Sequence, residues 1–207
     1  MNSAASAALR AAKEALRGEV KKKLLSMSKD EKLKQSRLIA DKLINHDRFK
    51  NSHRISIYLS TDHEVHTVGI LEQIFKMDKQ CFIPKYDLNN QHMDMVRLYS
   101  LEDLAKLPLT KWNIKQPSDD DHREEALATG GLDLMVIPGL AFDKRGGRIG
   151  TGQGYYDVYI DRCLHDPSGR PYLVGLAFQE QILHSIPMDE HDIVADDVVF
   201  PDNTSEV

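Results

Sequence analysis

An apolar run followed at once by a glycine-rich loop is the feature that most constrains this fold. Residues 132–137 have the length and composition of a buried strand. Residues 138–157 follow directly, with Gly150, Gly152 and Gly154 at alternate positions and a helix-like segment after them. A strand, a glycine loop and a helix in this order predict a ligand site at the carboxyl end of a strand in an α/β sheet.

The glycine loop is best interpreted as a phosphate site. Glycine has no Cβ, so backbone N–H groups in such a loop approach a ligand closely. The start of the next helix adds unpaired donors and a partial positive charge. A simple turn is the alternative, and Gly146-Gly147 accounts for that turn as a hairpin between Phe142 and Arg148. The spacing matches neither a Walker A loop nor a dinucleotide fingerprint.

Strands and helices are expected to alternate along the whole chain. Strands are predicted near residues 55–59, 81–84, 93–99, 132–137, 173–178 and 193–200. Helices are predicted near residues 4–26, 28–45, 65–76, 100–107 and 155–164. Ser28 and Glu31 have capping-box spacing at the start of the second helix, whose apolar face is expected to hold Leu33, Ile39, Leu43 and Ile44. This order predicts an α/β fold, with a mainly parallel or mixed central sheet and helices on both faces. One compact domain is expected over residues 1–207, with a helical pair in residues 1–46.

Composition excludes several classes of protein. The 207 residues are 41% hydrophobic and 29% charged, as in ordinary folded domains, and the net charge of −5 disfavours nucleic acid as a partner. No apolar run reaches the roughly 20 residues of a membrane span. Cys81 and Cys163 have no metal-ligand spacing, and two reduced cysteines fit the cytoplasm. The Ala- and Ser-rich start leaves mitochondrial import open.

Acidic side chains near the loop are candidates for a metal site. Asp157 either holds a cation or complements the dipole of the helix it begins, and Asp192 has the same status. Magnesium uses one or two carboxylates together with phosphate oxygens, so this pair suits it. Glu64, a few residues after a strand, either positions a substrate amine or caps a helix.

Basic and aromatic candidates also have two interpretations each. Lys13 and Arg17 share one helix face, and a solvated basic face is the simpler interpretation because Lys21 to Lys23 follow. Arg148 adjoins the glycine loop, where it could reach a phosphate. Trp112 either stacks on a flat ring or anchors a polar loop, and anchoring is the commoner role.

Taken together, the motifs resemble a known family. Residues 138–143, then Arg148-Ile149-Gly150-x-Gly-x-Gly and Tyr155-Tyr156-Asp157, resemble 5-formyltetrahydrofolate cyclo-ligases, and the animal members most closely. The further matching segments are Lys13-x-x-Leu16-Arg17, residues 55–64, Pro84-Lys85-Tyr86, Met93-Asp94-Met95, Trp112-Asn113-Ile114, and His191-Asp192 with Asp196. The ordered set covers nearly the whole chain and is more specific than any one motif.

The resemblance implies ATP- and Mg²⁺-dependent conversion of 5-formyltetrahydrofolate to 5,10-methenyltetrahydrofolate, with release of ADP and phosphate. The implied ATP contacts are Lys13, Arg17, Arg148, Ile149, Gly150, Thr151, Gly152, Gln153, Gly154, Tyr155 and Tyr156. With Lys13 and Arg17 among them, the resemblance also implies that the helical region 1–46 packs on the nucleotide site. The implied substrate contacts are Leu59, Glu64, Met93, Trp112 and Tyr155. Catalytic roles are implied for Tyr155 and Arg148, and metal binding for Asp157 and Asp192. The expected partners are ATP and the folate, with or without a polyglutamate tail, bound by a monomer that contacts no membrane.

Two alternatives stay open at this point. Thr151 and Gln153 are neutral where many members of the family carry basic or aromatic residues in the loop. A catalytically idle folate- or RNA-associated protein of the same fold is therefore one alternative. A sugar-phosphate isomerase of similar build is the other, and it rests on analogy of fold alone.

Overall fold

The computed structural model describes residues 3–87, 90–111, 113–189 and 192–201. Its helices are α1 (Ser3–Ser26), α2 (Lys29–Asn45), α3 (Asp47–Asn51), α4 (Val68–Lys76), α5 (Leu101–Lys106) and α6 (Tyr155–His165), with short 3₁₀ turns η1 (Leu127–Thr129) and η2 (Gln179–Gln181). Its strands are β1 (Arg54–Ile57), β2 (Gln80–Tyr86), β3 (Met93–Leu98), β4 (Leu134–Ile137), β5 (Ala141–Asp143), β6 (Arg148–Ile149), β7 (Tyr172–Leu176), β8 (Ile182–Leu183) and β9 (Asp197–Val199).

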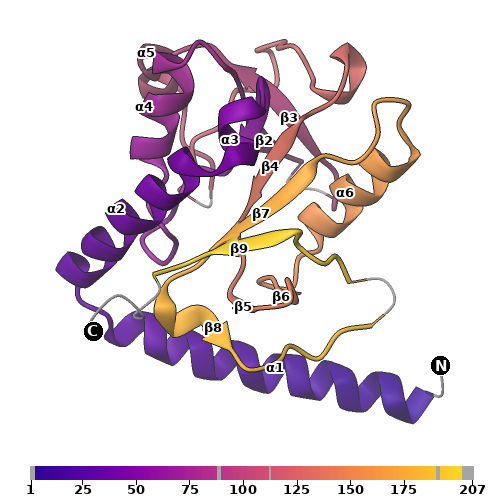
Figure 1. Ribbon diagram of the computed structural model, residues 1–207. Coiled ribbons are helices and arrows are strands. Elements are labelled where there is room, and N and C mark those ends of the chain that lie inside the picture. Colours follow the sequence, from indigo (N-terminus) through magenta and orange to yellow (C-terminus); the bar gives the residue numbers. More distant parts are fainter. Residues whose placement is uncertain (1–2, 88–89, 112, 190–191, 202–207) are drawn as a thin grey trace.

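A mixed six-stranded sheet forms the centre of the molecule, in the order β3-β2-β1-β4-β7-β9. Strands β2, β1, β4, β7 and β9 run parallel to their neighbours, and β3 pairs antiparallel with β2 at one edge. All four residues of β4 are buried, as expected for a strand covered on both faces. Helices α2 and α4 lie on one side of the sheet and α6 on the other (Figure 1). The predicted α/β fold class is confirmed.

A small three-stranded sheet, β6-β5-β8, lies below the main sheet in the view of Figure 1. Strands β5 and β6 form the hairpin predicted from Gly146-Gly147, with Phe142 opposite Arg148. Asp143 fixes this turn, since its buried carboxylate accepts hydrogen bonds from the backbone N–H groups of Arg145, Gly147 and Ile186 at 2.8–3.0 Å. Burial alone raises the pKa of a carboxyl, but these three donors outweigh it and lower the pKa of Asp143.

The N-terminal helical pair is present, with Ser28 as the predicted cap of α2. The Ser28 hydroxyl accepts a hydrogen bond from the Glu31 N–H at 3.1 Å. Ile39 and Leu43 are buried as predicted, but Leu33 is 41% exposed and does not belong to the apolar face of α2. Helix α1 is long and lies across the bottom of the molecule, beneath the small sheet (Figure 1). Among the described residues, no helix is both long and apolar enough to cross a bilayer.

Candidate active site

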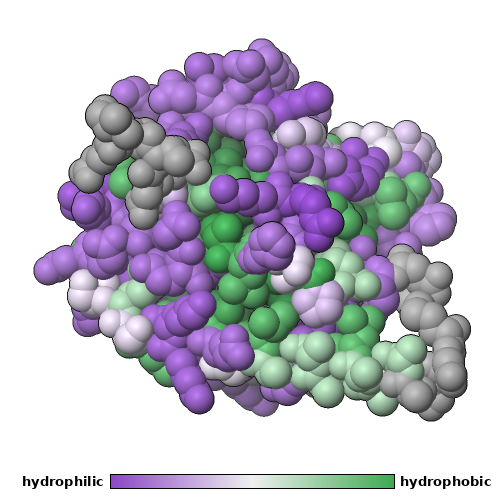
Figure 2. All heavy atoms as spheres, turned by 60° about the horizontal axis from the view of Figure 1, so that its bottom comes forward, coloured by the Kyte–Doolittle hydropathy of each residue, from purple (hydrophilic) through white to green (hydrophobic). Residues whose placement is uncertain are grey.

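A cavity of about 550 Å³ lies at the carboxyl ends of the central strands, where α1 meets the glycine loop. Its walls come from α1, from the segment after β1, from the segments after β4 and β6, and from the start of α6. The face that carries α1 shows apolar side chains gathered in the middle of a polar margin (Figure 2). The position agrees with the general placement of ligands in open α/β sheets.

The glycine loop forms one wall of this cavity. Gly152 has φ +103° and Gly154 has φ +77°, backbone conformations that side chains with a Cβ rarely adopt. Gly154 is also the cap residue of α6 and provides no side-chain hydrogen bond to it. Within the part of the chain that the structure describes, no side chain caps the first N–H groups of α6, which can therefore donate to an anion at the cavity.

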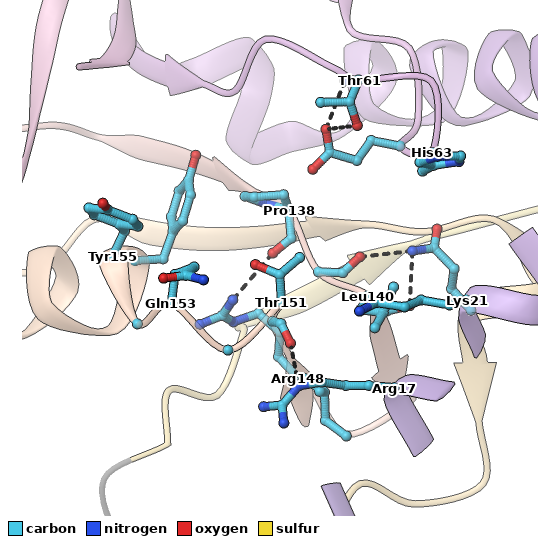
Figure 3. A pocket seen from close by; sticks show the side chains of 18 of the residues that line it. Arg17, Lys21, Thr61, His63, Pro138, Leu140, Arg148, Thr151, Gln153 and Tyr155 are labelled. Carbon is cyan, nitrogen blue, oxygen red and sulfur yellow. Dashed lines mark hydrogen bonds between the residues drawn. The ribbon is translucent and has the colours of Figure 1, made fainter. Parts of the chain in front are cut away.

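Helix α1 forms the opposite side of the loop and brings three cations to the cavity: Lys13, Arg17 and Lys21. The Arg17 Nε donates a hydrogen bond to the Gly150 carbonyl at 3.0 Å, which ties the helix to the loop (Figure 3). Lys13 pairs with Asp192, a residue from the far end of the chain. The interpretation of Lys13 and Arg17 as a merely solvated face is wrong, because both border the cavity.

The two acidic residues predicted to bind a metal each form an ion pair with a basic side chain. The Arg148 guanidinium is buried and donates to Asp157 Oδ1 at 2.5 Å and to the Pro138 carbonyl at 3.3 Å. Asp192 is bound by Lys13. Both acids line the cavity, so their carboxylates are within reach of a ligand. Within the described residues, no cluster of three His, Cys, Asp or Glu side chains suited to a metal is present.

Glu64 lines the cavity on the segment after β1, which lies across from the glycine loop, as the positions of Thr61 and Thr151 show (Figure 3). Its Oε2 accepts hydrogen bonds from the Thr61 backbone N–H at 2.8 Å and from the Thr61 hydroxyl at 2.9 Å (Figure 3). Helix α2 holds the same segment in place: the buried Lys32 donates to the Asp62 carbonyl, and the Ser36 hydroxyl accepts from the His66 N–H. One carboxylate oxygen of Glu64 is thus oriented by the protein, and the other can accept from a ligand.

Aromatic residues close the end of the cavity beside α6. The rings of Tyr86 and Tyr155 meet edge to face with centroids 5.0 Å apart. The Tyr155 hydroxyl donates to the Asp87 carbonyl at 3.1 Å, which fixes the ring. Burial raises the pKa of Tyr86 and of Tyr156, so both hydroxyls stay neutral at physiological pH.

Two of the residues predicted to contact the substrate do not line the cavity, and a third lies outside the described residues. Met93 is 1% exposed and packs in the core on β3, so it does not border the cavity. Leu59 packs against the core just before the segment that reaches the cavity, and it is not part of the wall. Trp112 lies outside the described residues.

Several wall residues were not singled out from the sequence as substrate or ATP contacts: Lys21, Leu24, Leu25, Thr61, His63, Tyr86, Ile114, Pro138, Gly139, Leu140 and Gln181. Lys21 carried a usable signal, because it continues the spacing of four residues from Lys13 and Arg17. Leu24 and Leu25 carried no such signal, since leucines at helical spacing equally predict packing in the core.

The fold and the site define an α/β protein with a glycine-rich loop beside a cavity at the carboxyl edge of its sheet. The family model for the 5-formyltetrahydrofolate cyclo-ligase family matches residues 9–201, and the chain belongs to that family. A 5-formyltetrahydrofolate cyclo-ligase of Mus musculus is 51% identical over 96% of this chain and 98% of its own length. A probable 5-formyltetrahydrofolate cyclo-ligase of Caenorhabditis elegans is 36% identical over 95% of this chain and 96% of its own length.

Solved structures agree with this assignment. The NMR structure of the 5,10-methenyltetrahydrofolate synthetase of Aquifex aeolicus superposes with a TM-score of 0.73 at 27% identity, covering 90% of this chain and 88% of that chain. A synthetase of the same name from Mycoplasma pneumoniae has a TM-score of 0.67 at 20% identity, over 91% of this chain and 98% of that chain, and supports the fold.

Proposed function

We propose that this protein closes the ring of 5-formyltetrahydrofolate to give 5,10-methenyltetrahydrofolate, with ATP converted to ADP and phosphate. The observation that carries the proposal is one cavity with two chemically different walls. The glycine loop, the start of α6 and the cations of α1 suit a polyphosphate. Glu64, held by Thr61 on the facing wall, suits the N–H groups of a pterin ring.

The reaction is a phosphoryl transfer followed by ring closure. The formyl oxygen is a poor leaving group until it takes the γ-phosphoryl group: an O–P bond forms there, the bond to the β-phosphate oxygen breaks, and ADP departs. The neighbouring arylamine nitrogen then attacks the activated carbon. A C–N bond forms, the C–O bond breaks, and the nitrogen's proton leaves together with the phosphate. The protein's contribution is positioning and stabilisation of charge.

Charge on the phosphates would be offset by Lys13, Arg17 and Arg148. Thr151 and Gln153 in the loop are neutral, so α1 supplies charge that the loop itself lacks: Arg17 lies against Gly150 and within 4 Å of where a Cβ of Gly152 would stand. The loop backbone supplies hydrogen-bond donors regardless of these side chains. The same wall includes Ile149, Gly154 and Tyr156.

The carboxylates present fit a magnesium ion. Mg²⁺ commonly takes one or two protein carboxylates with phosphate oxygens and water, and both Asp157 and Asp192 border the cavity. When bound, such an ion would supply positive charge that offsets the charge of the phosphates. Asp157 and Asp192 would hold the ion, and the basic side chains that pair with them now, Arg148 and Lys13, border the same cavity.

Tyr155 takes a narrower role than the sequence implied. Its hydroxyl is engaged by the Asp87 carbonyl, so we assign it to positioning the reacting groups with its ring rather than to proton transfer. Arg148 stays a candidate for stabilising the transferred phosphoryl group, because it is buried beside both Gly150 and Asp157.

The direct test of this function is a turnover assay. Purified protein is mixed with 5-formyltetrahydrofolate, ATP and Mg²⁺, and the near-ultraviolet absorbance of the methenyl product is followed. We expect absorbance to grow only when all three are present, with one phosphate released per product formed. Folate binding without any phosphate release would contradict the proposal and favour an idle binding protein.

Substitution of Gly152 by alanine tests the loop. A side chain at φ +103° strains the backbone by about 1–3 kcal/mol, so the loop should shift away from its anion-binding shape. We expect the affinity for ATP, measured by calorimetry, to fall about tenfold, since 1.4 kcal/mol of lost binding energy corresponds to that factor. Gly18→Ala, in the exposed middle of α1 where an added Cβ meets nothing within 4 Å, is the control and should leave ATP binding unchanged. Equal affinities in both variants would contradict the assignment.

A further inference from the structure

Lys21 is the third member of a row of cations on α1. Lys13, Arg17 and Lys21 follow one another at intervals of four residues, so all three face the cavity, and the row spans about 12 Å along the helix axis. The two lysines that follow, Lys22 and Lys23, are exposed and do not line the cavity. Only one residue of this basic run is therefore directed to the site.

The three cations differ in what they already bind. Lys13 pairs with Asp192, and Arg17 bonds the Gly150 carbonyl and pairs with Glu14. Lys21 has no ion pair or side-chain hydrogen bond with any residue that the structure describes. A cation at the edge of a cavity without a protein partner is available to an anionic group of the ligand.

The surroundings of Lys21 differ from those of the glycine loop. Lys21 lies near Leu140, on the side of the cavity away from Gln153 and Tyr155 (Figure 3). Its neighbours on α1 that also line the cavity are apolar: Leu24 is 2% exposed and Leu25 is 69% exposed. Such a wall suits a flat aromatic ring, and the exposed lysine beyond it suits a charge that lies partly in water.

We propose that Lys21 binds the carboxylate at the distal end of the folate substrate. This inference rests on the proposed function and deepens it. A substrate whose pterin ring lies at Glu64 extends through an aryl ring to a carboxylate-bearing tail. An apolar wall followed by an unpaired cation matches that order of groups. Lys21 thus determines preference for substrates with a charged tail, and the phosphates of ATP lie with Arg17 and the loop.

The test compares Lys21→Met with Lys22→Met, two neighbouring lysines of the same helix. Initial rates are measured with 5-formyltetrahydrofolate, with its polyglutamylated form, and with 5-formyltetrahydropteroate, which lacks the glutamate tail. For Lys21→Met we expect KM for the folate to rise about fivefold, the effect of one partly exposed ion pair, with a larger rise for the polyglutamylated form. The KM for the pteroate, the KM for ATP and kcat should not change. Lys22→Met should match the unmodified protein, and Lys21→Arg should restore most of the affinity.

Other outcomes overturn the proposal in distinguishable ways. A rise in the KM for ATP in Lys21→Met would assign Lys21 to the phosphates instead. Equal effects of Lys21→Met on the folate and on the pteroate would show that the tail is not involved. Absence of turnover by the unmodified protein would contradict the proposed function itself, whereas unchanged kinetics of Lys21→Met in an active enzyme would contradict only this inference.

Discussion

Replacement of Asp157 by asparagine is expected to reduce kcat at least about 100-fold, the usual cost of removing one preorganised electrostatic contact from a phosphoryl-transfer or acyl-transfer site. The amide keeps the shape of the side chain but carries no charge for a metal ion. Turnover is measured at saturating substrate and at increasing Mg²⁺ concentration. Asp161→Asn is the matched control, because Asp161 lies one turn further along α6 and is 68% exposed at its side chain. It should retain full activity.

The same substitution should also reduce stability, because Asp157 neutralises a buried arginine. The side chain of Arg148 is 5% exposed and that of Asp157 is 38% exposed. Leaving a buried cation without its carboxylate is costly, and the partial exposure of Asp157 limits the loss to about 1–3 kcal/mol. The double variant Arg148→Met with Asp157→Asn should regain stability in a double-mutant cycle while staying inactive. Full activity of Asp157→Asn would contradict the metal assignment.

Asp143→Asn is expected to lower the free energy of unfolding by about 3 kcal/mol, since hydrogen bonds to a charged acceptor contribute roughly 1.5–3 kcal/mol each when both partners are buried. Asp143 is 2% exposed and its two carboxylate oxygens accept from three backbone N–H groups. In asparagine an NH₂ group replaces one of these oxygens, and this group cannot accept the hydrogen bond of the backbone N–H that faces it. In a protein of this size, that loss corresponds to a fall in Tm of about 6–12 °C. Asp41→Asn, at an exposed position of α2, should leave Tm unchanged.

The effect of pH follows from the same carboxylate. The folded-state pKa of Asp143 lies below its ordinary value of 3.8, so the ionised form stabilises the fold. This contribution is complete above the unfolded-state pKa, near 4, and is lost as the pH falls through the lower folded-state value. Denaturation at pH 7 and at pH 3 should therefore show a smaller difference between Asp143→Asn and the unmodified protein at pH 3. A constant difference at both values would contradict the assignment.

Most of the architecture was predictable because it depends on local patterns. The buried strand before the loop, the Ser28 cap and the Gly146-Gly147 hairpin each rest on a few neighbouring residues, and all three are present. Leu33 was misassigned because a helix pattern shows which residues share a face and not how wide the buried stripe is. Its position at the margin of α2 leaves it 41% exposed.

Site residues could be predicted where they lie in one continuous segment, but not where they depend on contacts between segments far apart in the sequence. The glycine loop and the start of α6 could be recognised because loop and helix are consecutive. Lys21 continues the four-residue spacing of Lys13 and Arg17, but only the docking of α1 against the loop shows that this face of the helix borders the cavity. Likewise, the pairing of Asp157 with Arg148 depends on how β6 packs beside α6.

The ion pair between Lys13 and Asp192 has a consequence for how the protein is made. These residues are 179 positions apart in the chain, yet both border one cavity. During synthesis, α1 leaves the ribosome first and must wait for almost the entire chain before its partner exists. A nascent chain that stops before residue 192 therefore contains all strands of the main sheet except β9, but its cavity lacks Asp192. The sheet can thus form before the site is complete.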